Sequence, residues 1–165
     1  MRSGKGPRTA GGYTYVAMLV AVAVMSAGLA ATGEVWSHAV RREKEAELLF
    51  VGQQYRQAIA FYYEQSPGNG KQYPAKLEDL VEDKRFPSPR RHLRKLYADP
   101  ITGRAEWGII EAPGGGIMGV HSRSNAEPVK RAEFGFRDRV FHQATNYYEW
   151  RFFYEPPTMA AVPAP

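Results

Sequence analysis

The sequence predicts an α+β fold in which the second half of a long N-terminal α-helix packs on a small antiparallel β-sheet. Residues 13–33 form an apolar run that contains no charged residue. The run continues without proline into a charged segment with helical periodicity, which ends near Glu64. Short apolar segments separated by glycine and proline follow, and this pattern is typical of strands and turns.

The apolar run has the length of a membrane span, since about 20 residues cross a hydrocarbon core of ~30 Å. Residues 1–12 carry three cations and no acid, so we expect a basic leader peptide there. We expect residues 13–33 to be the transmembrane and assembly half of the helix. The next cations begin only at Arg41, so the positive-inside rule favours a cytoplasmic N-terminus.

A secretory signal peptide, cleaved after Ala30 or Ala31, is the alternative interpretation of this region. Helical periodicity beyond Gly33 argues against it, because a signal peptide normally ends in an extended cleavage region. The apolar stripe consists of Trp36, Val40, Leu48, Val51, Tyr55, Ala58, Ile59 and Tyr62. We therefore expect one helix over residues 13–64 and a head over residues 34–155.

The helix is expected to end at residues 66–70, which contain Pro67 and two glycines. A short helix is predicted over residues 74–83, because Pro74 suits a first helical position. The next segment, residues 84–95, is a basic loop with six Lys and Arg. Such a charge run is either a solvated surface or a contact for anionic partners.

Residues 105–111 and 116–122 are predicted to form a β-hairpin around a Pro-Gly turn. Aromatic and charged residues alternate over 148–154, which predicts a half-buried strand. Residues 137–146 fit either a short helix or a loop, and we expect a disordered tail at 156–165. The predicted core packs Leu48, Val51, Tyr55, Ile59 and Tyr62 against Trp107, Ile109, Met118, Val120, Trp150 and Phe152.

The sequence offers no motif for catalysis or metal binding. It has no cysteine, and His38, His92, His121 and His142 lack metal-ligand spacing. His121 and Ser122 occur without a nucleophile elbow, and the glycines at 114–116 lack the Lys-Ser/Thr of a phosphate loop. Outside the leader, the chain has 19 Lys and Arg and 17 Asp and Glu, so its net charge is close to neutral. We therefore expect no enzyme activity, cofactor, metal or nucleic-acid partner.

The N-terminus resembles that of type IV pilin-like proteins, and the chain is most similar to a pseudopilin of a type II secretion system. Gly12 matches the last leader residue of that family, Tyr13 the first mature residue and Thr14 the common second one. The segments YPAKLEDLVED, LYADPITGRAEWG and GGGIMGVHSRS resemble the head of a major pseudopilin.

This resemblance implies that a prepilin peptidase cleaves between Gly12 and Tyr13, and that Tyr13 is a candidate for N-methylation. It also implies a structural subunit of a periplasmic filament that drives protein transport across the outer membrane. The subunit would first be a single-pass inner-membrane protein with a periplasmic head. Its partners would be membrane lipid, other pseudopilins and the inner-membrane secretion platform.

The chain departs from this family in three ways. Ala17 occupies the recruitment position at which the family usually has a glutamate. The C-terminal region lacks the clustered acids of the family's calcium site, and the cysteine pair of ordinary type IV pilins is missing. A minor or divergent pseudopilin fits these departures. The alternatives are a pilus-like subunit for adhesion or DNA uptake, and a conventionally secreted or anchored periplasmic protein.

Overall fold

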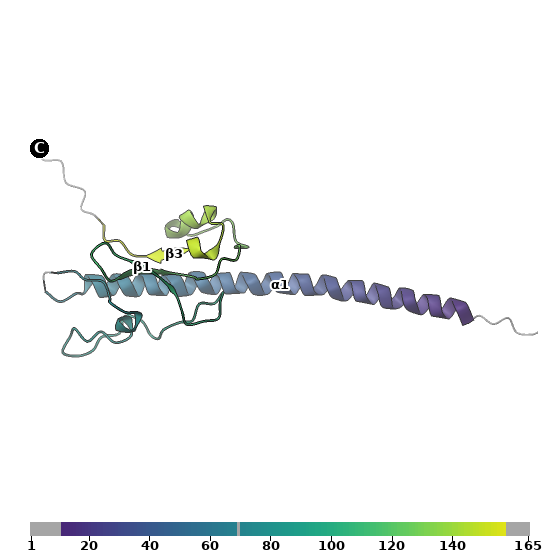
Figure 1. The fold of residues 1–165 in the computed structure, drawn as a ribbon, viewed down its shortest axis with the longest axis horizontal. Coiled ribbons are helices and arrows are strands. Elements are labelled where there is room, and N and C mark those ends of the chain that lie inside the picture. Colours follow the sequence, from purple (N-terminus) through teal and green to yellow (C-terminus); the bar gives the residue numbers. More distant parts are fainter. Residues whose placement is uncertain (1–10, 69, 158–165) are drawn as a thin grey trace, which may run out of the picture. The chain divides into compact units, whose positions relative to one another are not determined.

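The computed structural model describes residues 11–68 and 70–157. Most of the predicted leader and of the predicted tail therefore lies outside the described residues. The chain divides into two compact units, Met1–Val40 and Arg41–Pro165. Helix α1, Gly11–Glu64, contributes to both units, and every other helix and strand belongs to the second unit, called the head below (Figure 1).

The prediction that residues 13–33 form a transmembrane half of the helix is wrong. A membrane span needs about 20 predominantly apolar residues in one helix. Within the described residues, no helix meets the requirement of length and apolarity for crossing a membrane. This finding also overturns the predicted single-pass location in the inner membrane with a cytoplasmic N-terminus and a periplasmic head.

The head combines its part of α1 with short 3₁₀ helices and a three-stranded antiparallel sheet of order β1-β2-β3. The strands are β1 (Gly108–Glu111), β2 (Ile117–His121) and β3 (Arg151–Phe153). The 3₁₀ helices are η1 (Leu77–Leu80), η2 (Phe136–Gln143) and η3 (Tyr147–Glu149). The sheet lies along the α1 part of the head (Figure 1).

The predicted β-hairpin is confirmed, with strands shorter than expected. Ile109 pairs with Val120, and the register shifts between Ile110 and Glu111. The turn needs glycine at two positions, because Gly115 has φ 87° and Gly116 has φ 83°. Both values lie in the left-handed region that side chains with a Cβ rarely adopt.

Two predicted elements are shorter than the sequence suggested. The helix predicted over residues 74–83 is a single 3₁₀ turn at Leu77–Leu80. The strand predicted over residues 148–154 begins only at Arg151, because η3 precedes it. The Asn146 side chain caps η3 by accepting a hydrogen bond from the backbone N–H of Glu149 at 3.2 Å. This local cap competes with the strand for the same backbone.

The core lies where the apolar stripe of α1 meets the sheet. The buried residues include Leu48, Val51, Tyr55, Ile59 and Tyr62 of α1, with Trp107, Met118, Val120, Trp150 and Phe152. All ten residues were predicted to lie in the core. The same prediction for Ile109 was wrong, since 40% of its surface is exposed. Ile109 lies on an edge strand whose residues alternate between half-buried and exposed.

Gly52 lets the sheet approach the helix closely. It is buried within α1, and a Cβ at this position would lie 2.4 Å from Cγ of Phe152. Glycine costs a helix about 1 kcal/mol relative to alanine. Here the Phe152 ring occupies the space that a side chain would need, so glycine is the residue that fits.

Candidate assembly surface

The first unit exposes an unusual amount of apolar side chain. Every described side chain from Tyr13 to Ser26 is exposed. The large apolar residues among them are Tyr13, Tyr15, Val16, Met18, Leu19, Val20, Val22, Val24 and Met25, each with more than half of its surface accessible. We call these nine residues the apolar surface of α1. Contiguous exposed apolar patches usually mark interaction sites, so this surface is the strongest candidate for a functional site.

The three site residues predicted from the sequence lie at the start of this surface. Gly12 belongs to the first turn of α1, which begins at Gly11. Tyr13 is 82% exposed, and Ala17 is also exposed. Cleavage between Gly12 and Tyr13, methylation of Tyr13 and the effect of Ala17 on recruitment stay predictions.

The side chains that could suggest catalysis are held in structural contacts. Ser122 is buried and donates a hydrogen bond to Oδ2 of Asp99 at 2.7 Å. His121 contacts the backbone oxygen of Ser122 through Nδ1 at 2.8 Å, and its ring packs against Tyr148. Ser122 Oγ therefore has Asp99, and not His121, as its partner. Among the described residues, no cluster of three His, Cys, Asp or Glu could hold a metal ion.

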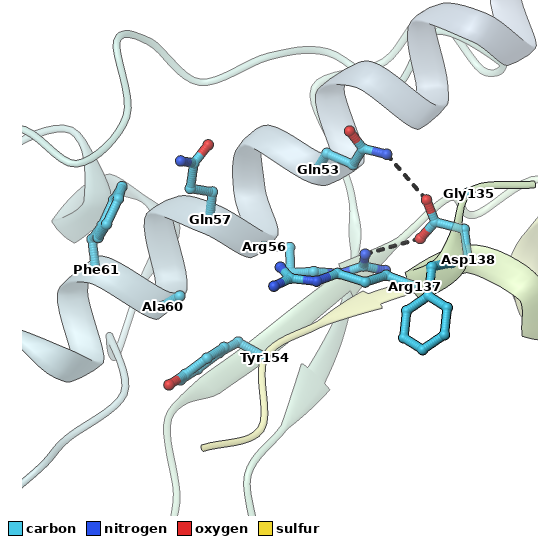
Figure 2. Close-up of a pocket in the computed structure, with 10 residues that line it drawn as sticks. Gln53, Arg56, Gln57, Ala60, Phe61, Gly135, Arg137, Asp138 and Tyr154 are labelled. Atoms are coloured by element: carbon cyan, nitrogen blue, oxygen red, sulfur yellow. Dashed lines mark hydrogen bonds and ion pairs between the residues drawn. The ribbon is translucent and has the colours of Figure 1, made fainter. Parts of the chain in front are cut away.

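A groove of about 640 Å³ lies in the head between α1 and the segment that begins η2. Figure 2 shows that Asp138 faces α1, where it accepts a hydrogen bond from Gln53 at 3.0 Å and pairs with Arg56 at 2.9 Å. Phe61 and Phe136 also line the groove and are exposed. Asp138 is therefore held against α1 by Gln53 and by the ion pair with Arg56, and the two phenylalanines give the groove an exposed aromatic surface.

Glu45 is a buried carboxylate that sequence analysis missed. It lies on α1, is 1% exposed, and accepts hydrogen bonds from the backbone N–H groups of Val129 at 2.5 Å and Lys130 at 3.1 Å. The hydroxyl of Tyr147 donates to it at 2.8 Å. Burial, and then this hydrogen bond, raise the pKa of Tyr147 above its ordinary value. Glu45 thus attaches two distant segments of the head to α1.

The basic loop, residues 84–95, is closed by a second buried carboxylate. The backbones of Asp83 and Arg90 exchange two hydrogen bonds, at 2.8 and 3.2 Å. The Asp83 carboxylate accepts from Nε of Arg85 at 2.9 Å and contacts Nε2 of His92 at 3.1 Å. Arg85 continues to the end of α1, where it donates to the backbone oxygen of Tyr62 at 2.9 Å. The loop is therefore fixed to the head at several points.

We expect this network to make stability depend on acid pH. Burial alone would raise the pKa of Asp83, but the hydrogen bonds from Arg85 and His92 outweigh it and lower the pKa from 3.8 to about 2. The contribution of Asp83 is then fully present above pH ~4 and is lost as the pH falls to ~2, by about 2 kcal/mol. Urea unfolding of the wild type and of Asp83→Asn should show a stability difference that shrinks over this range. A difference that stays constant with pH would contradict the assignment.

Comparisons of the chain with family models, with curated proteins and with solved structures found no match.

Proposed function

We propose that this chain is a structural subunit of a filament, a pseudopilin-like protein of a type II secretion system that assembles through the apolar surface of α1. The proposal rests on the exposure of that surface. Its first residue, Tyr13, is 82% exposed, and its last residue, Met25, is 70% exposed. Removing apolar area from water contributes about 25 cal/mol per Å². Contact with equivalent helices of neighbouring subunits would bury these residues.

The resemblance of the N-terminus to type IV pilin-like proteins supports the same proposal. In this proposal a prepilin peptidase removes the leader between Gly12 and Tyr13, and Tyr13 becomes the first residue of the mature subunit. The cleaved bond lies in the first turn of α1, which begins at Gly11.

Ala17, which replaces the usual glutamate of the family, indicates which kind of filament subunit the chain is. A glutamate at this position would supply a carboxylate for the terminal ammonium group of a neighbour, whereas the methyl group of Ala17 supplies none. Copies of this chain would then be joined only by apolar contact and by contacts between heads. We therefore propose a divergent subunit that forms short oligomers alone and joins longer filaments beside glutamate-bearing pseudopilins.

A charge placed in the apolar surface tests this function. In sedimentation velocity, the full-length chain is expected to form short oligomers, and Val20→Asp is expected to remain monomeric. Val20 is 57% exposed, so the substitution leaves the core of the head intact. Ala105→Asp introduces the same charge at an exposed position of the head and should oligomerise like the wild type. Equal oligomerisation of Val20→Asp and the wild type would reject the proposal.

A further inference from the structure

The charge of the chain is distributed unevenly. Of the 22 Lys and Arg, three lie in the leader and six in the basic loop. The rest of the chain therefore has 13 Lys and Arg and 17 Asp and Glu. The basic loop itself contains no acid. The rest of the chain is therefore net acidic, and the net positive charge of the head depends on this loop.

The cations at the end of this loop lack acidic partners. Some cations elsewhere in the head are paired, such as Arg123 with Glu106 at 3.0 Å. Others, such as the exposed Arg137 and Arg151, also make no ion pair in the part of the chain that the structure describes. Within the described residues, the exposed side chains of Arg91 and Arg94 make no hydrogen bond or ion pair. Because the loop is closed through Asp83, these cations are presented on a segment that is already ordered, which lowers the entropy cost of binding.

Two exposed acids on α1 lack cationic partners. Glu43 and Glu47 are exposed and lie four residues apart, so they share one face of the helix. Like charges at this spacing repel each other, and within the described residues neither side chain has a hydrogen bond or an ion pair. Lys44 lies three residues before Glu47, a spacing at which helix side chains can meet, but the described part of the chain has no ion pair between the two. A cation from outside would relieve the repulsion between the two acids.

The two charged surfaces lie at different positions along the α1 part of the head. Arg90 donates to the side chain of Gln65 at 3.2 Å, which places the middle of the basic loop beside the end of α1. The chain then returns along α1, since the backbone oxygen of Tyr97 accepts a hydrogen bond from Tyr55 at 3.1 Å. Within the described residues, no ion pair joins the loop to Glu43 or Glu47 of the same copy, so these acids remain available to a second copy.

We propose that the basic loop of one copy docks on Glu43 and Glu47 of a second copy. This inference rests on the proposed function and identifies the contact between heads within the oligomer. The two surfaces differ, so the contact is heterologous, and a heterologous contact that does not close into a ring generates an open filament. Successive heads would stack so that the basic loop of one meets Glu43 and Glu47 of the next.

A charge swap in the full-length chain tests this contact. The loop variant Arg91→Glu/Arg94→Glu and the helix variant Glu43→Lys/Glu47→Lys are each expected to weaken self-association about tenfold, since each turns two exposed attractions into repulsions. The variant with all four substitutions should recover the association of the wild type. Ala105→Asp shows the effect of a single charge added elsewhere on the head, and melting temperatures check that each head remains folded.

The outcomes separate this inference from the proposed function. If the loop variant associates like the wild type while Val20→Asp is monomeric, the docking proposal fails and the filament proposal stands. If Val20→Asp also associates normally, both fail. Failure of the fourfold variant to recover would contradict direct pairing of the two surfaces. Unchanged association with lost retention on duplex DNA would assign the loop to nucleic acid, and would also overturn the docking proposal.

Discussion

Replacing Glu45 with alanine is expected to lower the free energy of unfolding of the head by about 3–5 kcal/mol. The substitution leaves the backbone N–H groups of Val129 and Lys130 without their acceptor, and the Tyr147 hydroxyl loses its partner as well. Glu45 is 1% exposed and Tyr147 is 3% exposed, so the Tyr147 hydroxyl cannot regain water easily. Urea unfolding monitored by tryptophan fluorescence gives the measurement.

The neighbouring Glu47 provides the matched control for this prediction. It lies on the same helix and is exposed, so Glu47→Ala should change the stability by less than about 0.5 kcal/mol. Tyr147→Phe removes one donor and keeps the ring, so we expect a loss of about 1.5–3 kcal/mol. If Glu45→Ala cost no more than Glu47→Ala, the carboxylate would not attach the two segments to α1.

Truncating Trp150 to alanine should have an effect of similar size, about 3–5 kcal/mol. Its side chain is fully buried, and its ring is 5.5 Å from that of Phe141 in a stacked arrangement and 5.4 Å from that of Phe134. Removing the indole therefore opens a cavity between β3 and the two phenylalanines. The midpoint of thermal unfolding of the full-length chain provides the measurement.

Phenylalanine substitutions distinguish the two buried tryptophans. Within the described residues, the Nε1 of Trp150 is buried without a hydrogen-bond partner, whereas Nε1 of Trp107 donates to the backbone oxygen of Tyr97 at 2.8 Å. Trp150→Phe loses no hydrogen bond, so Trp107→Phe should cost about 1 kcal/mol more. The opposite order would show that the hydrogen-bond assignment of the two indoles is incorrect.

The core and the hairpin could be predicted because their signals are local. Residues such as Leu48, Val51 and Tyr55 repeat at helical spacing, and the hairpin strands flank a turn rich in glycine. The prediction that Ile109 is buried failed because both hairpin strands are apolar at most positions. The alternation of apolar and polar residues therefore did not show which face of the strand packs against the core. The prediction of a membrane span was wrong, because within the described residues no helix is long and apolar enough to cross a membrane.

The buried carboxylates could not be found in this way. Glu45 stands between Lys44 and Ala46 in a charged stretch of the sequence, where it resembles any solvated helix residue. Its partners lie 84 to 102 residues later in the chain. Asp83 likewise ends an acidic segment and precedes the basic loop. Only the tertiary structure reveals which acids leave water.

Protection of a single cysteine in the apolar surface tests the central claim most directly. The chain contains no cysteine, so Leu19→Cys and Ala105→Cys each place one thiol in the full-length chain. Leu19 is 51% exposed on α1, so its thiol is accessible in a single copy and becomes buried when copies assemble through this surface. We predict that a polar maleimide labels Leu19→Cys more slowly at high than at low protein concentration, whereas the labelling rate of Ala105→Cys does not change. A labelling rate of Leu19→Cys that is independent of protein concentration would contradict assembly through α1.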